Sequence, residues 1–254
     1  MEEDGIARAA LVTGAGRRIG RALALGLARS GFDVALHCRG SRQEAEETAE
    51  AVRALGWRAA ILTADLADAG AVAALVPAAA AALGPLGVLV NNASLFETDA
   101  VGQLDPDLWD RQFAVNLRAP LFLSQAFAAQ VAGEGVIVNI VDQRVWKLTP
   151  RFFSYTLTKA ALWTATRTLA QALAPKVRVN AVGPGPTLPS ARQTPEDFAR
   201  QRAALLLARG PSPEEIADAV GFILRARAMT GQMIALDGGQ HLAWETPDVR
   251  ECRE

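Results

Sequence analysis

The chain is poor in several residue types that commonly carry chemistry. Its 254 residues include one tyrosine, two histidines and two cysteines, and lysine occurs only at Lys147, Lys159 and Lys176. Two cysteines, Cys38 and Cys252, cannot build a disulfide framework, and neither belongs to a CxxC pair or a His/Cys cluster. We therefore expect a cytoplasmic protein without a structural metal.

The chain also lacks an excess of charge of one sign and long apolar runs. A formal net charge of −1 and a pI near 6.2 provide no broad cationic surface for a nucleic-acid backbone, although a local basic site is compatible with these totals. The first residues are acidic and do not resemble a secretory signal. No uncharged apolar run reaches about 18 residues, so we expect no membrane span and a small-molecule partner.

Short apolar segments alternate with helical ones along the chain. Strands are expected at residues 9–12, 33–37, 58–63, 87–90, 136–141, 177–182 and 233–236. Helices are expected at 18–29, 43–55, 70–83, 106–131, 153–173 and 213–226, with a kink or break at Pro120. This alternation predicts a single α/β domain over residues 1–254, with a doubly wound parallel seven-stranded sheet and helices on both faces.

Residues 183–212 do not follow this alternation. They open with Gly-Pro-Gly-Pro and contain a further proline, Pro189. Connections of this length are often lids or binding loops, so we expect this segment to cover a substrate. The tail at 241–254 is expected either to add to an interface or to be disordered.

A glycine-rich turn follows the first predicted strand. It contains Gly14, Gly16 and Gly20, with Arg17, Arg18 and Ile19 between them, and it opens the first predicted helix. A Rossmann-type fold binds the pyrophosphate of a dinucleotide at this place, because glycine lets the backbone approach the phosphates at a helix N-terminus. Alone, the pattern is also compatible with a simple tight turn.

The end of the second predicted strand indicates which dinucleotide binds. An NAD site would place a carboxylate there, but the chain reads His37, Cys38, Arg39, Gly40, Ser41. Arg39 and Ser41, with Arg17 or Arg18 nearby, could bind the 2′-phosphate of NADPH. The alternative is that Arg39 is an ordinary solvated loop residue.

The single tyrosine stands one helical turn before one of the three lysines. Tyr155 and Lys159 share a face of the predicted helix at 153–173. An ammonium close to a phenol favours the phenolate, so Lys159 is expected to lower the pKa of Tyr155 from about 10 and make it a proton donor or acceptor. The alternative is an incidental pair.

In these features the chain resembles the short-chain dehydrogenase/reductase family from about residue 8 to residue 240. The resemblance implies that Tyr155 is the general acid, that Lys159 binds the nicotinamide ribose, that Asn116 supports a proton-relay water and that Asp65 lies at the adenine. Further cofactor contacts that it implies are His37, Leu66, Asn92, Ala93, Ser94, Pro184, Gly185 and Thr187. The motifs that carry the resemblance are the turn at 13–20, Asp65-Leu66, Asn91-Asn92-Ala93, Asn116, Tyr155 with Lys159, Pro184-Gly185 and Leu236-Asp237-Gly238-Gly239.

Two departures from the family pattern narrow the resemblance. Arg18 replaces the usual middle glycine, and Asp142 replaces the usual catalytic serine upstream of the tyrosine. Both are typical of the pteridine reductase branch, which includes dihydromonapterin reductases and also favours Asn-Asn-Ala-Ser, as at Ser94. In that branch Phe96 would stack the pterin, Ser94 would line the pocket, and Arg18 would reach the substrate or pyrophosphate. Phe96 could otherwise be ordinary core, and Asp142 the mark of a diverged reductase.

These residues favour an NADPH-dependent reductase of dihydropterin or dihydrofolate-like substrates. An Asp/Tyr pair can relay the proton that reduction of a ring C=N requires, with Asp142 and Tyr155 contacting the substrate. The alternatives are a carbonyl reductase of the same family, acting on a 3-oxoacyl thioester or a sugar-derived ketone, and a non-catalytic NADPH-binding protein. The family resemblance also implies a homodimer or homotetramer, with contacts through the helices at 106–131 and 153–173. The roles of Gln143, Arg144 and Trp146 beside Asp142 stay open.

Overall fold

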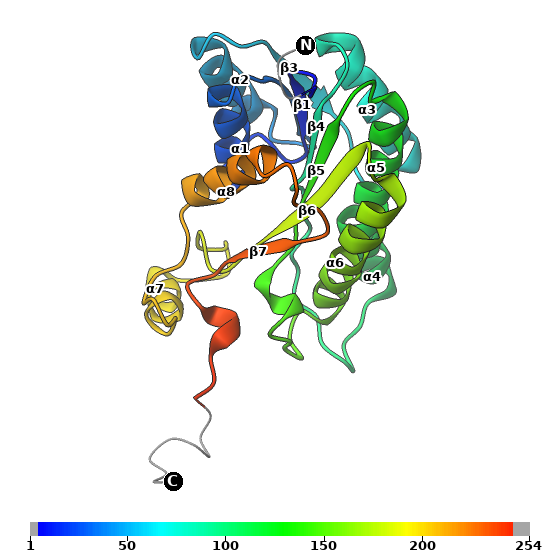
Figure 1. Ribbon diagram of the computed structural model, residues 1–254. Coiled ribbons are helices and arrows are strands. Elements are labelled where there is room, and N and C mark those ends of the chain that lie inside the picture. The colour runs from blue at the N-terminus through cyan, green and yellow to red at the C-terminus, as the bar shows by residue number, and fades with distance from the viewer. Residues whose placement is uncertain (1–4, 246–254) are drawn as a thin grey trace.

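The computed structural model describes residues 5–245 and shows strands and helices in regular alternation (Figure 1). The strands are β1 (Ala9–Val12), β2 (Asp33–Cys38), β3 (Ala59–Thr63), β4 (Val88–Asn91), β5 (Gly135–Ile140), β6 (Val177–Pro184) and β7 (Met233–Leu236). The helices are α1 (Arg18–Arg29), α2 (Arg42–Ala54), α3 (Ala69–Leu83), α4 (Pro106–Phe113), α5 (Ala119–Gln130), α6 (Phe153–Leu173), α7 (Pro195–Ala203) and α8 (Pro213–Arg225). Residues 1–4 and the part of the expected tail at 246–254 lie outside the described residues.

All seven strands form one parallel sheet in the order β3-β2-β1-β4-β5-β6-β7. The predicted doubly wound Rossmann-type sheet is therefore confirmed. The strand order reverses between β1 and β4, and in such folds ligands bind beyond the carboxyl ends of the strands at that point. Helices α1, α2 and α8 cover one face, while α3, α5 and α6 cover the other (Figure 1).

Strand side chains alternate between two apolar cores. In β1, Val12 packs with Leu23 of α1 and Ile223 of α8, whereas Leu11 packs on the other face with Phe127 of α5. These side chains are fully buried. Because both faces of each central strand are covered, the strands are continuous apolar runs, which is why the sequence shows them clearly.

Two helical segments differ from the sequence prediction. The long helix expected at 106–131 does not break at Pro120; a π-helical turn, Ala114–Arg118, joins α4 to α5. Pro120 has no N–H to donate to the carbonyl of Asn116, so the regular α-helical bonding is lost at this place. Helix α7 lies inside the segment that we expected to be a loop, and Thr194 caps it by accepting a hydrogen bond from the Asp197 N–H at 3.1 Å.

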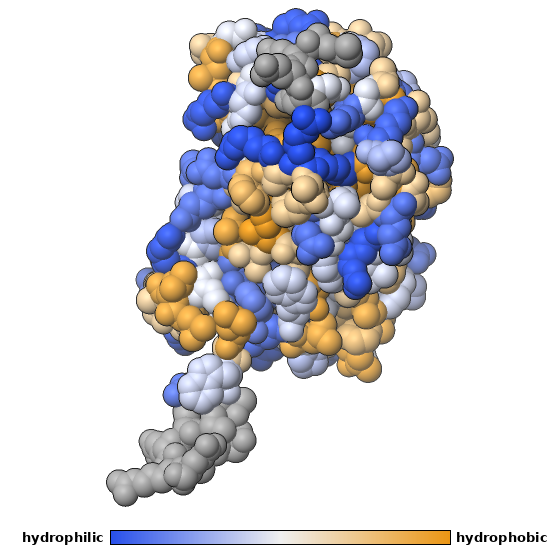
Figure 2. Space-filling view, viewed as in Figure 1, coloured by the Kyte–Doolittle hydropathy of each residue, from blue (hydrophilic) through white to orange (hydrophobic). Residues whose placement is uncertain are grey.

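The surface mixes hydrophilic and hydrophobic side chains. On the face shown in Figure 2, hydrophobic side chains gather near α7, where Leu206 and Leu207 are among the exposed large residues. Within residues 5–245, no helix is both long and apolar enough to cross a membrane.

Candidate active site

A cavity of about 700 Å³ opens at the carboxyl ends of the central strands. Its walls come from the β1–α1 turn, the segment after β4, the segment between β5 and α6, the first turns of α6 and the segment after β6. The lining residues include Arg18, Asn92, Ser94, Phe96, Asp142, Arg144, Phe152, Tyr155, Lys159, Pro184, Gly185, Thr187 and Arg192. The fold thus brings together residues that are far apart in the sequence.

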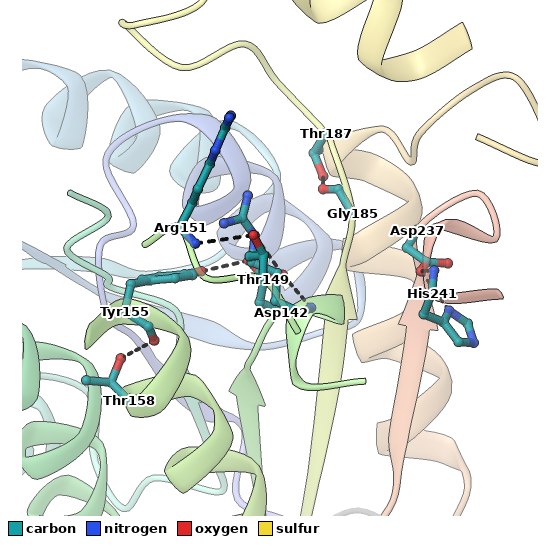
Figure 3. A network of polar contacts seen from close by, with 10 residues as sticks. Asp142, Thr149, Arg151, Tyr155, Thr158, Gly185, Thr187, Asp237 and His241 are labelled. Atoms are coloured by element: carbon teal, nitrogen blue, oxygen red, sulfur yellow. Dashed lines mark hydrogen bonds and ion pairs between the residues drawn. The ribbon is translucent and has the colours of Figure 1, made fainter. Parts of the chain in front are cut away.

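Asp142 and Tyr155 form a direct hydrogen bond in this cavity. The Tyr155 hydroxyl donates to Oδ2 of Asp142 at 2.8 Å (Figure 3). Asp142 follows the end of β5, and its other carboxylate oxygen accepts from the Arg144 N–H at 2.8 Å. Burial raises the pKa of Asp142 above its ordinary value, against the opposing charge of Arg144.

Tyr155 is held as a neutral phenol. Burial raises the pKa of its hydroxyl well above 10, and the neighbouring Asp142 carboxyl raises it further. The expectation that Lys159 lowers this pKa is wrong for the structure: the ammonium Nζ donates to the Ile140 carbonyl at 2.8 Å and lies 5.7 Å from the centre of the tyrosine ring. Burial also lowers the pKa of Lys159 to about 8, which weakens its effect as a cation.

Asn116 lies in the π-helical turn, where its side chain joins two walls of the site. Its Oδ1 accepts from the Leu95 N–H at 2.7 Å and the Ser94 hydroxyl at 3.2 Å, and its Nδ2 donates to Oγ1 of Thr158 at 3.2 Å. The side chain is therefore engaged in holding the segment after β4 against α6. Pro120 leaves the main-chain carbonyl of Asn116 without its usual helical donor.

The glycine turn is shaped by close backbone contacts. Gly14 has a φ of +65°, and a Cβ on Gly20 would lie 1.9 Å from the Gly14 carbonyl oxygen. A Cβ on Gly16 would lie 3.2 Å from Ser41, at the start of α2. The turn therefore needs small residues to pack on α1 and α2, and it presents backbone at the N-terminus of α1 as a phosphate site requires.

His37 lies behind this turn. Its Nδ1 accepts a hydrogen bond from the Gly14 N–H at 3.1 Å, and Nε2 pairs with the Ala64 carbonyl at 3.1 Å. The ring is 2% exposed. Both ring nitrogens are thus engaged within the protein, and His37 supports the turn; its contact with the cofactor stays a prediction.

Arg18 reaches the segment after β6. Its guanidinium donates to the carbonyls of Leu188 at 3.3 Å and Pro189 at 3.0 Å. The residue adopts a φ of +55°, a conformation that glycine accepts more easily, so the family's glycine has been exchanged for a strained residue that binds the loop. Arg18 also lines the cavity, where Ile19 follows it.

The residues expected at the adenosine end lie at the edge of the sheet beyond β2 and β3. Asp65 accepts a hydrogen bond from the Ala67 N–H, and this bond is the main reason that its pKa is lowered. Arg39 is exposed, and its positive charge lowers the pKa of Asp65 further. Asp65 also pairs with Arg111 at 3.0 Å. Arg17 caps α1 with its main chain and lies 3.8 Å from Glu44. The other expected residues here are Ser41, which precedes α2, and Leu66, which is buried.

Hydrogen bonds tie the ends of β1 and β4 together beneath the cavity. The Thr13 hydroxyl oxygen accepts from the N–H groups of Asn92 at 2.9 Å and Ala93 at 3.0 Å. The Asn92 amide donates to the Thr13 carbonyl at 2.8 Å. Across the cavity Thr187 donates to the Gly185 carbonyl at 3.0 Å (Figure 3), just after Pro184 ends β6.

An aromatic wall lies beside the Asp142–Tyr155 pair. Phe96 stacks on Phe152 with ring centres 4.4 Å apart, and meets Tyr155 edge-on at 4.7 Å. Arg144 lies 4.7 Å from the centre of Phe152, and Arg192 lies 5.2 Å from that of Phe96. The sequence indicated Phe96 but missed Phe152 and Arg192, because their contacts cross long stretches of chain.

Asp99 is a buried residue that the sequence did not indicate. Its two carboxylate oxygens accept from the Ser154 N–H at 3.2 and 3.1 Å, next to Tyr155 at the start of α6. Phe152 occupies the cap position of this helix and has no side-chain oxygen to offer. Asp99 supplies the missing acceptor from another part of the chain, and so fixes the turn that carries Tyr155.

The family comparison agrees with this geometry. A family model described as enoyl-(acyl carrier protein) reductase matches residues 14–241. A curated 3-oxoacyl-[acyl-carrier-protein] reductase FabG from Staphylococcus aureus is 32% identical over 242 residues, covering 92% of this chain and 98% of that protein. The chain belongs to the short-chain dehydrogenase/reductase family of oxidoreductases.

Two solved structures are more similar to the chain. The FolM alternative dihydrofolate reductase 1 from Brucella canis, complexed with NADP, is 53% identical with a TM-score of 0.90 and covers 96% of this chain and 98% of that one. The protein of the same name from Brucella suis, also in complex with NADP, is 55% identical with a TM-score of 0.91. The match covers 94% of this chain and 97% of that one.

Proposed function

We propose that the protein is an NADPH-dependent reductase of a dihydropterin or a dihydrofolate-like substrate. The observation that carries the proposal is the hydrogen bond between the Tyr155 hydroxyl and the Asp142 carboxyl, 2.8 Å long, inside the cavity. A serine would suit a carbonyl oxygen, whereas an acid with a raised pKa suits the protonation of a ring nitrogen. The likeness to two dihydrofolate reductases named FolM supports this choice of substrate.

The site fits NADPH. The glycine turn has no space for side chains against the neighbouring protein, so its backbone is packed closely at the N-terminus of α1. Arg39 follows the end of β2, where an NAD site would place a carboxylate. Gly14, Gly16, Ile19 and Gly20 would hold the pyrophosphate, and Arg17, Arg39 and Ser41 the 2′-phosphate. Asp65 and Leu66 would hold the adenine; Asn92, Ala93, Tyr155, Lys159, Pro184, Gly185 and Thr187 would hold the nicotinamide half. When bound, NADPH supplies a hydride; the chain's own residues supply the proton. Both structural neighbours hold NADP.

Tyr155 and Asp142 are proposed to deliver that proton together. A tyrosine that gave up its proton beside an ionised Asp142 would leave two negative charges in contact, which burial makes unfavourable. The raised pKa of Asp142 lets the carboxyl hold a proton of its own and pass it to Tyr155 as the phenol donates to the substrate nitrogen. Asn116, through its main-chain carbonyl, would hold the water that restores the proton.

The substrate ring is proposed to pack against the wall formed by Phe96 and Phe152. Ser94 would contact the ring from the segment after β4, where its hydroxyl already donates to Asn116 at 3.2 Å. Arg18 would act from the opposite wall, where it lines the cavity.

A substrate panel tests the proposal. NADPH oxidation should be followed with dihydromonapterin, dihydrobiopterin, dihydrofolate and an acetoacetyl thioester. We expect turnover of one or more of the three pterins to exceed that of the thioester. Turnover of the thioester alone would overturn the proposal and favour a 3-oxoacyl reductase, a function that the similarity to FabG supports. Tight NADPH binding without any turnover would favour the non-catalytic alternative.

We also propose that the protein is a homodimer or homotetramer. Phe122 on α5 is 56% exposed and Leu157 on α6 is 39% exposed, so both helices present apolar side chains at the surface. Light scattering coupled to size exclusion would distinguish a monomer from either assembly.

A further inference from the structure

The outer part of the cavity carries two cations that the proposed reaction does not use. Lys147 and Arg151 both line the cavity, both are exposed, and both belong to the segment between β5 and α6. Among the lining residues Asp142 is the one carboxylate, and it belongs to the reacting pair. The mouth of the site is therefore positively charged.

The other cations of the cavity are already engaged. Arg192 pairs with Glu97 at 2.7 Å, Arg18 donates to two loop carbonyls, and Lys159 donates to the Ile140 carbonyl. The Arg144 guanidinium lies over Phe152, and its Nε is 3.9 Å from Oδ1 of Asp142, so its charge is paired. In the described part of the chain no carboxylate lies within ion-pair distance of Lys147 or Arg151. Their charges are thus available to a ligand.

The cavity changes in character from its floor to its mouth. The floor holds Tyr155, which is 6% exposed, and the half-buried Asp142. The rings of Phe96 and Phe152 stand next to this pair. At the mouth, Leu148 is 72% exposed between the two cations, and Figure 3 shows the Arg151 side chain extending away from Tyr155 and Asp142. A ligand that matches this order has a flat polar ring at the floor, packed against Phe96 and Phe152, and an anionic end at the mouth.

We propose that Lys147 and Arg151 bind the carboxylates of a glutamyl tail, so that the preferred substrate is a dihydrofolate with one or more glutamates. The inference rests on the proposed function, because it assumes that the pterin ring reacts at Tyr155. Dihydrofolate carries its glutamate at the far end of the pterin's side chain, beyond the aminobenzoyl ring, so its anionic end is separated from the reacting ring as the two cations are from Tyr155. Dihydrobiopterin has a neutral side chain and would gain nothing from the two cations.

The test compares charged and neutral substrates in a double variant. KM should be measured for dihydrofolate, for dihydrofolate with three glutamates and for dihydrobiopterin, in wild type and in Lys147→Gln/Arg151→Gln. The matched control is Arg29→Gln/Lys176→Gln, which removes the same charge from two exposed residues outside the cavity lining. Exposed ion pairs are weak. We therefore expect KM for dihydrofolate to be about three- to tenfold higher in Lys147→Gln/Arg151→Gln than in wild type, and KM for the triglutamate to rise by more.

The remaining readouts separate the tail site from a structural effect. KM for dihydrobiopterin should stay unchanged in both variants, and the control should resemble wild type with every substrate. Added salt should raise the wild-type KM for the triglutamate and abolish the difference between the variants, since exposed charges are screened.

Each contrary result has a distinct meaning. Equal KM values for the triglutamate in wild type and in the cavity variant would overturn the tail site and leave the proposed function intact. KM should also be measured for an acidic carrier-protein thioester. A rise in KM confined to that substrate in the cavity variant would assign the two cations to protein docking and overturn the tail site. If the wild type reduced none of dihydromonapterin, dihydrobiopterin and dihydrofolate, the proposed function would be overturned, and the tail site with it.

Discussion

The protonation of Tyr155 depends on one neighbouring residue. The Asp142 carboxylate accepts a hydrogen bond from the Tyr155 hydroxyl. Burial at the cavity floor raises the pKa of both groups. Lys159, which the sequence suggested as the tuning residue, is bound to a carbonyl instead. In the proposed mechanism, aspartate in place of the family's usual serine makes the tyrosine one half of a coupled acid pair.

The first prediction concerns the pH dependence of the reaction. As pH rises through the raised pKa of Asp142, the pair loses its second proton, so kcat for the pterin should fall on the alkaline side. Asp142→Asn keeps an acceptor for the Tyr155 hydroxyl but cannot titrate. We expect kcat to be about 100-fold lower in this variant, with that alkaline limb gone. A pH profile of kcat for both proteins is the measurement, and an unchanged limb in the variant would refute the coupled pair.

The same carboxyl should affect stability. A carboxyl whose pKa is higher in the folded than in the unfolded chain stabilises the fold below its unfolded pKa, and this stabilisation is lost as pH rises through the folded pKa. Asp142→Asn should therefore gain stability relative to wild type as pH rises above the ordinary carboxylate range. Urea unfolding of both proteins over a series of pH values measures this difference. If the difference in unfolding free energy between Asp142→Asn and wild type did not change with pH, ionisation of Asp142 would not destabilise the fold.

At the scale of elements, the start of α6 sets the position of Tyr155, the proposed proton donor. Asp99 caps this helix by accepting from the Ser154 N–H, and the buried Gln112 amide donates to the Ser154 hydroxyl at 2.7 Å. Both contacts come from segments that are distant in sequence. The first turn of α6 is thus held from outside the helix.

We predict that Asp99→Ala destabilises the protein by about 1 to 3 kcal/mol, because it leaves a buried N–H without an acceptor. It should also lower kcat more than it changes KM for NADPH, since Tyr155 is displaced while the glycine turn is not. Asp105→Ala is the matched control: Asp105 caps α4 at an exposed position, accepting from the Asp107 N–H at 3.0 Å. Equal losses of kcat in the two variants would show that Asp99 has no special role in positioning.

The elements also show how far sequence can predict this fold. The strands were found within about two residues of their observed ends, because apolar runs between turn residues are local features. Helix α7 was missed although Thr194 and Pro195 form an ordinary start signal, since the surrounding prolines favoured a loop. Asp99 and Phe152 could not be found, because capping and ring stacking across the cavity depend on tertiary structure. The direction of the Tyr155 pKa shift was also beyond sequence, since it follows from burial and not from spacing.

At the scale of the whole molecule, the proposed function divides the carboxyl edge of the sheet into a cofactor half and a substrate half. The cofactor half is built by the β1–α1 turn and the ends of β2 and β3, and the substrate half by the segments after β4, β5 and β6. Arg18 links the two halves through its hydrogen bonds to the segment after β6. Cofactor preference and substrate preference should therefore respond to different substitutions.

Arg39 provides the test for the cofactor half. Arg39→Gln should raise KM for NADPH about tenfold and leave KM for NADH unchanged, because only NADPH has a 2′-phosphate to bind. Steady-state kinetics with both cofactors measures this. If wild type bound NADH as tightly as NADPH, the assignment of Arg39 would be wrong.

The central claim is that Asp142 makes this member of the family a pterin reductase. The most direct measurement is kcat/KM for a dihydropterin and for an acetoacetyl thioester, in wild type and in Asp142→Ser, with the NADPH dissociation constant measured alongside. We predict that wild type prefers the pterin, and that the variant loses about 100-fold in kcat/KM for the pterin with unchanged NADPH affinity. Equal pterin reduction by the two proteins would contradict the account.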